Sequence, residues 1–210
     1  MSLVTLSATY GAGGSQVGPA LARRLNVPFV DRLIPTQVAA RLGVSSAEAY
    51  AHDEISPGLI ARLFASLAPI GQAFGTEGPS HTIGESNFLE TTEQVILERA
   101  NSGHGVILGR AAAVVLSDDA RALHVRLDGP REARVTQAMR IQGIDRSTAE
   151  RRMTETDRAR HAYVRHFHHA DARDPDLYHL VIDSTAVDLD ACVKLIALAA
   201  EDRVDASPVV

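Results

Sequence analysis

The chain has 210 residues, of which 45% are hydrophobic, and a formal net charge of −5 at pH 7. This length supplies one sizeable hydrophobic core and leaves little room for a second, so we expect a single domain over residues 1–210. The acidic balance argues against nucleic acid or membrane partners bound by bulk charge. Since no apolar stretch reaches about twenty residues and no basic N-terminal region precedes a long apolar one, we expect a cytoplasmic protein.

The first predicted elements flank a glycine-rich loop. Residues 3–9 form a short apolar, β-branched run that fits a buried strand, and residues 17–25 carry apolar side chains at helical spacing. Between them lies the sequence ATYGAGGS at positions 8–15. A strand, a glycine loop and a helix in this order bring backbone N–H groups and a helix N-terminus to one point, which is what an anion site requires.

The loop has the layout of a Walker A motif, G-x-x-x-x-G-K-[ST], without its lysine. Ala8 stands at the first glycine, Gly14 at the lysine and Ser15 at the residue whose hydroxyl ligates magnesium. The chain contains one lysine, Lys194, against twenty arginines, so arginine has to neutralise any phosphate charge. The alternative for the loop taken alone is a tight turn that binds nothing.

Strands and helices alternate along the rest of the chain. We expect further strands at 27–30, 105–109, 122–128 and 179–183, and helices at 33–43, 46–52, 57–70, 88–102, 110–117, 130–142, 146–169 and 187–201. This alternation predicts a parallel sheet with helices on both faces and ligands at the carboxyl ends of its strands. Residues 71–87 are rich in Gly, Ser and Thr and are expected to form a mobile loop.

Arginine is concentrated in the C-terminal half, where ten of the twenty lie between residues 131 and 173. Many of them fall on the predicted helix 146–169, in which Asp157 and Arg160 are three residues apart and can interact. One interpretation is a solvated helix in which acidic and basic side chains pair at i,i+4 spacing. The other is a set of guanidinium groups that close over transferring phosphates.

Histidines and aspartates cluster at the end of the same helix. The residues are His166, His168, His169, Asp171 and Asp174. Two or three such side chains can make a metal site, but no cysteine accompanies them and the setting is polar. We therefore expect an exposed end of the helix in preference to a dedicated zinc site.

In these features the chain resembles the cytidylate kinase-like proteins among the P-loop nucleoside monophosphate kinases. The stretches that carry the resemblance are YGAGGSQVGPALARRLNVPFVDR (10–32), GVILGRAAAVVL (105–116), MTETDRARHAYVRHF (153–167) and YHLVIDSTAVDLDA (178–191). The family pattern is a Gly-Gly loop without lysine, an Asp after the second strand, a Val-Ile-x-Gly-Arg turn, a T-D-x-A-R helix and an aspartate that ends the last strand. The order and spacing of these motifs are more specific than any motif alone.

The resemblance implies an α/β P-loop NTPase-type fold of three layers, with a five-stranded parallel sheet in the order 2-3-1-4-5. It implies an acceptor-binding insertion at about 33–90 and an arginine-rich helical lid at about 145–175. The implied reaction is phosphoryl transfer to a small anionic acceptor, with ATP and Mg2+ as cofactors and a nucleoside monophosphate as the first choice of acceptor. A homodimer is compatible with the sequence, which does not fix the oligomeric state.

The resemblance also assigns roles to individual residues. Those that would hold the donor nucleotide are Gly11, Ala12, Gly13, Gly14, Ser15 and Gln16, with Ser15 as the Mg2+ ligand. Those that would hold the acceptor are Arg110, Asp31 and Arg32. Asp157 and Arg160 match the D-x-x-R pair of the lid, and Arg158 and Arg152 are further catalytic candidates by position.

Three positions depart from the family pattern. Ala111 stands where an Asp helps to read the acceptor nucleoside, Gln37 where an Arg follows the second strand, and Met153 where an Arg precedes the lid Asp by four residues. The acceptor is therefore CMP, another nucleoside monophosphate or a different phosphorylatable metabolite. The alternative from another class is a nucleotide-binding or regulatory module with little turnover.

Overall fold

The computed structural model describes residues 2–30, 93–94, 96–109 and 111–204. Five strands form one parallel sheet in the order β2-β3-β1-β4-β5. Their bounds are β1 Leu3–Ala8, β2 Phe29–Val30, β3 Gly105–Leu108, β4 Ala122–Asp128 and β5 Leu180–Asp183. The predicted fold class and strand order are confirmed.

Helices connect successive strands. They are α1 Gly14–Leu25, α7 Ala112–Val115, α8 Arg131–Gln142, α9 Arg146–His168 and α10 Leu189–Val204, with a 3-10 turn at Pro175–Leu177. Residues 93–94 and 96–101 are also helical. The predicted helices at 33–43, 46–52 and 57–70 and the predicted loop 71–87 lie outside the described residues. No helix of the described part is long and apolar enough to cross a membrane.

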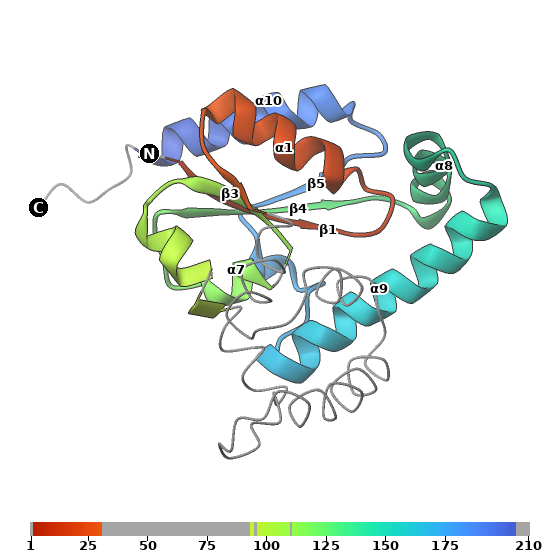
Figure 1. Cartoon of the computed structure of the whole chain (residues 1–210), viewed down its shortest axis with the longest axis horizontal. Coiled ribbons are helices and arrows are strands. Elements are labelled where there is room, and N and C mark those ends of the chain that lie inside the picture. Colours follow the sequence, from red (N-terminus) through yellow and green to blue (C-terminus); the bar gives the residue numbers. More distant parts are fainter. Residues whose placement is uncertain (1, 31–92, 95, 110, 205–210) are drawn as a thin grey trace, which may run out of the picture.

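The helices form layers on the two faces of the sheet (Figure 1). Helices α1 and α10 cover one face, and α7 and α9 lie on the other. The largest buried cluster lies between the sheet and the first pair, where Leu21 and Ile196 meet strand residues such as Leu6 and Val125. Because all strands run the same way, the loops after β1 and β4 open at one edge of the sheet, near α8 and the first half of α9.

Strand β4 buries polar side chains on the face turned away from α1. Leu123, Val125 and Leu127 join the main core, whereas the alternating residues His124 and Arg126 are 4% and 8% exposed. A second strand supports them, because Thr5 Oγ1 of β1 lies 2.7 Å from His124 Nδ1. The sheet therefore has an apolar face under α1 and α10 and a partly polar face toward α9.

Helices α8 and α9 form an antiparallel hairpin. Gly143, with φ of 65°, ends α8, and Asp145 caps α9 by accepting hydrogen bonds from the N–H (2.9 Å) and hydroxyl (2.7 Å) of Thr148. A small cluster that includes Val135 and the fully buried Met153 packs the two helices together. Met153 thus contributes packing at the position where the family pattern has an arginine. The predicted lid helix 146–169 matches α9 within one residue.

Candidate active site

The glycine loop, residues 8–15, is shaped by two glycines in the left-handed region. Gly11 has φ of 80° and Gly13 has φ of 78°. A Cβ atom on Gly11 would collide with the carbonyl oxygen of Arg134, and one on Gly13 would lie 2.7 Å from Cδ2 of Leu189. Both positions therefore need glycine for conformation and for space, and the loop packs directly against α8 and the start of α10.

The carbonyl groups of the glycine loop are held by side chains from elsewhere in the fold. The four pairs are Ala8 O with Arg160 Nη1 (2.8 Å), Tyr10 O with Arg134 Nη1 (3.0 Å), Gly11 O with Gln137 Nε2 (3.0 Å) and Ala12 O with Ser184 Oγ (2.7 Å). Within the described residues, the N–H groups of Gly13, Gly14 and Ser15 have no acceptor. These donors lie at the start of the 12-residue helix α1, where the helix dipole favours an anion.

Ser15 and Gln16 occupy the first turn of α1 with exposed side chains. The helix begins at Gly14, earlier than the predicted residue 17, because the left-handed Gly13 caps it and accepts hydrogen bonds from the N–H groups of Gln16 and Val17, both at 2.9 Å. Ser15 therefore lies in the same helical turn as the unpaired N–H groups.

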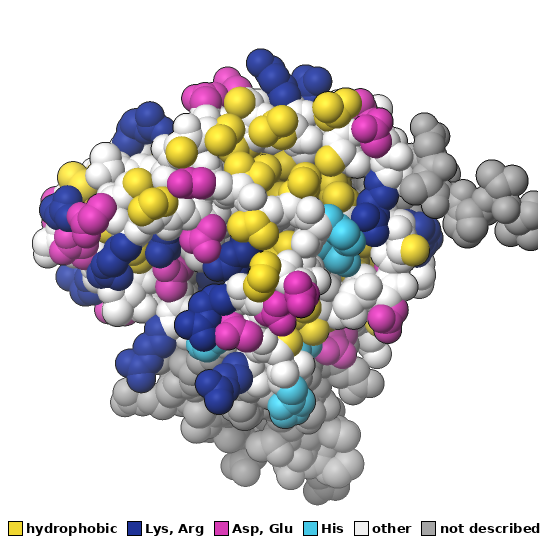
Figure 2. Space-filling view, turned by 180° about the vertical axis from the view of Figure 1, so that it is seen from behind, with side chains coloured by type: hydrophobic (Ala, Val, Ile, Leu, Met, Phe, Trp, Pro, Cys, Tyr) yellow, Lys and Arg dark blue, Asp and Glu magenta, His cyan; other side chains and the backbone are white. Residues whose placement is uncertain are grey.

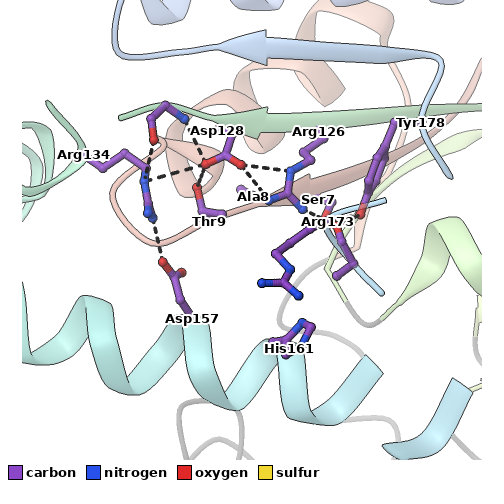
Figure 3. Close-up of polar contacts among 12 residues, drawn as sticks. Ser7, Ala8, Thr9, Arg126, Asp128, Arg134, Asp157, His161, Arg173 and Tyr178 are labelled. Atoms are coloured by element: carbon purple, nitrogen blue, oxygen red, sulfur yellow. Dashed lines mark hydrogen bonds and ion pairs between the residues drawn. The ribbon is translucent and has the colours of Figure 1, made fainter. Parts of the chain in front are cut away.

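Helix α9 is fastened to the glycine loop by Asp157. Its Oδ1 accepts a hydrogen bond from the N–H of Tyr10 at 2.8 Å, and its Oδ2 pairs with Arg134 Nη1 at 2.7 Å. Arg134 also donates from Nε to the carbonyl of Gly129 at 2.9 Å, so one guanidinium joins α8, α9 and two loops (Figure 3). Together with the contact of Arg160 with Ala8, this means that α9 contacts the loop at two of the loop's residues.

Below the loop, Asp128 ends β4 in a charged network (Figure 3). Its Oδ2 accepts from Nε (3.1 Å) and Nη2 (2.6 Å) of Arg126, and its Oδ1 accepts from Thr9 Oγ1 (2.8 Å) and the N–H of Gly129 (2.9 Å). Burial alone would raise the pKa of Asp128, but these hydrogen bonds outweigh it and lower the pKa below its usual value. Asp128 is therefore an ionised anchor for the first residues of the loop.

Arg126 contacts three residues of the fold. Besides Asp128, its Nη1 donates to the carbonyl of Ala172, and its guanidinium carbon lies 5.7 Å from the centre of the Tyr178 ring. Its burial would lower the pKa, and the hydrogen bonds to Asp128 raise it above the usual value. The segment that follows α9 is thereby tied to β4.

The structure separates the four predicted catalytic residues into two groups. Asp157 and Arg160 contact the glycine loop, as described above. Arg152 instead donates to the side chain of Gln142 at 3.1 Å, and Arg158 is exposed without a polar partner among the described residues. Seen from behind, basic side chains gather on the side of the molecule where α8 and α9 lie (Figure 2).

The predicted acceptor residues Asp31, Arg32 and Arg110 lie outside the described part of the chain. Tyr10, which could have stacked on a ligand or packed under the turn, packs against the cluster between α8 and α9, and its hydroxyl donates to Gln142 at 2.9 Å. The loop's aromatic residue is thus part of the hairpin contact.

The histidine cluster differs from its predicted arrangement at His168. The side chain of His168 is only 5% exposed, and its Nδ1 lies 3.5 Å from Glu93 Oε1, so the end of α9 packs against the helix that contains Glu93. Burial lowers the pKa of His168. Among the described residues, no group of three His, Cys, Asp or Glu side chains is placed to hold a metal ion.

Several residues of the site were not identified from the sequence. They are Thr9, Arg126, Asp128, Arg134 and Gln137. Asp128 carried a usable signal, because it ends a strand at the edge where ligands of α/β sheets gather. Arg134 and Gln137 share one face of α8 at i,i+3 spacing, but only the folded chain shows that this face meets the loop.

Several solved structures share the fold of this chain. A crystal structure of an uncharacterized protein from Eubacterium ventriosum ATCC 27560 has a TM-score of 0.65 at 19% identity and covers 96% of this chain and 99% of that chain. A shikimate kinase from Bacteroides thetaiotaomicron has a TM-score of 0.50 at 16% identity, with 95% and 98% covered. A gluconokinase from Sinorhizobium meliloti 1021 has a TM-score of 0.48 at 15% identity, with 99% and 98% covered.

At these identities the likeness to solved structures concerns the fold, which is that of P-loop kinases. Among curated proteins none matches the sequence. The sequence profile of the cytidylate kinase-like family matches residues 3–186, which is most of the chain. The protein therefore belongs to the cytidylate kinase-like family.

Proposed function

We propose that the protein transfers a phosphoryl group from ATP to a small anionic acceptor, with a nucleoside monophosphate as the first candidate. The observation that carries the proposal is the joint between the glycine loop and the lid. N–H groups without acceptors lie at the start of α1, and Arg160 of α9 reaches the same loop at 2.8 Å. Phosphoryl transfer asks a protein mainly for alignment and for charge neutralisation, and this joint offers both.

On the donor side, residues 11–16 would hold the phosphates through backbone N–H groups, and the Ser15 hydroxyl would ligate Mg2+. When bound, ATP would supply the transferable phosphate, and Mg2+ would supply a divalent charge that offsets the charge of the phosphates. The protein keeps the loop in one shape, because Gln137 and Ser184 donate hydrogen bonds to the carbonyls of Gly11 and Ala12. Carbonyl dipoles that are occupied in this way would repel a bound oxygen anion less.

On the lid side, Arg160 would neutralise charge that develops during transfer, and Asp157 would hold the lid in place. Arg158 and Arg152 remain proposed catalytic residues that would have to move to reach the phosphates. Arg110, Asp31 and Arg32 remain proposed ligands of the acceptor. Since Ala111 and Met153 replace family residues at the acceptor side and the lid, we leave the acceptor class open between nucleoside monophosphates and other small metabolites.

A second candidate function is a nucleotide-binding module with little turnover. It is favoured by the arrangement of the lid, in which Arg160 holds a loop carbonyl and Arg158 does not contact the loop. In that case the lid would serve to close over a bound nucleotide without supporting transfer.

One assay separates the two candidates. ADP release from ATP and Mg2+ is measured over a panel of nucleoside monophosphates and small alcohols, including shikimate, and nucleotide binding is measured in parallel by calorimetry. Turnover that depends on one acceptor supports the kinase. Tight nucleotide binding without turnover over the whole panel supports the binding module, and the absence of both removes the glycine loop from either role.

A further inference from the structure

The two departures of the glycine loop from a Walker A motif lie against each other. A Cβ atom built on Gly14, the lysine position, would lie 2.6 Å from the Cβ of Ala8, the first-glycine position, and 3.3 Å from Leu108 Cδ1. Carbon atoms in contact need about 3.5 Å or more. A side chain at position 14 is therefore excluded as long as position 8 carries a methyl group.

The backbone of Gly14 does not itself require glycine. Gly14 is the first residue of α1, and it is absent from the residues with positive φ among those described. Its close neighbour below 3 Å is a methyl carbon at the end of β1, which has no flexible far end to move aside. The steric requirement for glycine at position 14 thus comes mainly from Ala8.

Ala8 is also the residue that receives the lid arginine. Its carbonyl accepts the hydrogen bond from Arg160 Nη1 at 2.8 Å, across 152 positions of the sequence. A cation therefore reaches the carbonyl of the same residue whose methyl group blocks position 14, and it comes from α9 and not from α1. A guanidinium has five N–H donors in a planar fork, which lets one group bind a carbonyl and a phosphate oxygen together.

We propose that Ala8 and Gly14 replace the glycine and lysine of a Walker A motif as a matched pair, because the methyl group of Ala8 leaves room only for glycine at position 14. In this exchange, the cation that faces the phosphates is Arg160 on helix α9 and not a side chain at position 14. The functional half of this inference rests on the proposed function, whereas the steric half does not. A loop lysine stays beside the phosphates in every position of the lid. Arg160 is beside them only while α9 is docked, so neutralisation of the donor is tied to the contact made by Asp157.

The steric half is tested by thermal unfolding of Gly14→Lys, Ala8→Gly and Ala8→Gly/Gly14→Lys. We expect Gly14→Lys alone to lower the midpoint strongly and Ala8→Gly in the same chain to recover most of the loss. Additive effects of the two substitutions would overturn the exchange. A Gly14→Lys chain that fails to fold leaves the test intact, because recovery of folding in the double variant is then the readout.

The functional half is tested by rescue. Arg160→Ala is expected to lower turnover by about a hundredfold. The triple variant Ala8→Gly/Gly14→Lys/Arg160→Ala is expected to turn over at least about tenfold faster than Arg160→Ala. Inorganic triphosphate with Mg2+ gives a readout independent of the acceptor, since calorimetry should show tighter binding to the triple variant than to Arg160→Ala. Arg151→Ala, on the exposed side of α9, is the matched control and should change neither quantity.

The outcomes distinguish this inference from the proposed function. If the wild type binds no triphosphate or nucleotide, the proposed function fails and the unfolding cycle still decides the steric exchange. If the wild type binds and turns over but the triple variant is no better than Arg160→Ala, the lysine does not replace the arginine. In that case Arg160 does not take the place of a loop lysine, and the functional half of the inference is overturned.

Discussion

At the scale of single residues, the glycine loop makes its strongest demand at Gly13, where the backbone is left-handed and Leu189 leaves no space for a side chain. We expect Gly13→Val to abolish nucleotide binding, because the side chain displaces the N–H groups at the start of α1. Unfolding should stay cooperative, since the main core does not change. Calorimetric titration with nucleotide and a urea melt measure the two effects.

The matched control for this variant is Gly143→Ala. Gly143 also has a left-handed φ, 65°, but an added Cβ has no neighbour within 4 Å. Its replacement should cost about 1–2 kcal/mol of conformational energy and leave nucleotide binding as it is. Unchanged affinity in Gly13→Val, or an equal loss in both variants, would remove the loop from the binding site.

His124 makes stability depend on pH. Burial and the neighbouring His179 ring, 5.0 Å away, lower its pKa from 6.5 to about 4. The unfolded chain then binds this proton more tightly than the folded one, so the contribution of His124 is complete above pH 6.5 and is lost as the pH falls toward 4. We expect a loss of about 3 kcal/mol over that range. Urea melts from pH 7 to 4 check this.

His124→Gln isolates this contribution from the carboxylates that titrate at lower pH. The variant should be less stable at pH 7 and show a flatter pH dependence between 6.5 and 4. Asp128 affects stability at a lower pH than His124 does, because its lowered pKa preserves its stabilising effect until the pH falls below about 3.8. If the variant keeps the wild-type slope between pH 6.5 and 4, His124 is not the source of it.

At the scale of elements, the joint between α8, α9 and the loop depends on Arg134. Its side chain is 12% exposed and holds Gly129 O, Tyr10 O and Asp157 at once. Lysine keeps the charge but cannot reach all three acceptors with one point-like group. We expect Arg134→Lys to cost about 2 kcal/mol and to speed hydrogen exchange over α9. Arg140→Lys, exposed on the same helix and hydrogen bonded within α8 to Gln137 at 3.5 Å, is the control and should leave the exchange rates of α9 unchanged.

Elements with a clear apolar period or cap were predictable from the sequence. The helix at 146–169 was predicted almost to the residue, and the structure shows Asp145 capping it. Helix α1 was predicted too short, because its first turn carries Gly14 and Ser15 and has no apolar residue to mark it. Helix α7 was predicted too long, because Ala111 adopts φ of 54° and the helix starts after it.

The residues of the site were predictable where a motif fixed them and not where pairing in space fixed them. The glycine loop and the Asp157–Arg160 pair follow from local spacing. Arg134 and Gln137 do not, because their partners lie more than a hundred positions away and depend on which helix faces the loop. The burial of Arg126 was likewise hidden, since a charged residue in an apolar strand pattern gives no sign of its partner Asp128.

At the scale of the whole molecule, Arg160 joins the last third of the chain to the first strand. We expect Arg160→Ala to lower turnover by about 10² or more while nucleotide affinity changes by less than about tenfold, because the lost interaction acts chiefly in the transition state. Steady-state kinetics and calorimetry give the two numbers. A larger change in affinity than in turnover would assign Arg160 to ground-state binding.

Arg158→Ala reports on movement of the lid. Arg158 is exposed and does not contact the loop in this structure, so a loss of turnover comparable to that of Arg160→Ala requires α9 to move during the reaction. Full activity of the Arg158 variant would restrict the catalytic role to Arg160.

The alternation of strands and helices predicted the parallel sheet, but the order of its strands came from the resemblance, because alternation alone allows several orders.

The side chains that hold the loop carbonyls have a consequence for how the protein is made. The glycine loop leaves the ribosome well before Ser184, which holds the carbonyl of Ala12 from 172 positions later in the sequence. Arg134, Gln137 and Arg160 are also distant, so the nascent chain carries the loop sequence long before it carries the loop's shape. A ribosome-bound chain that ends before Ser184 should lack a formed anion site, and the site should appear only after Ser184 has left the ribosome.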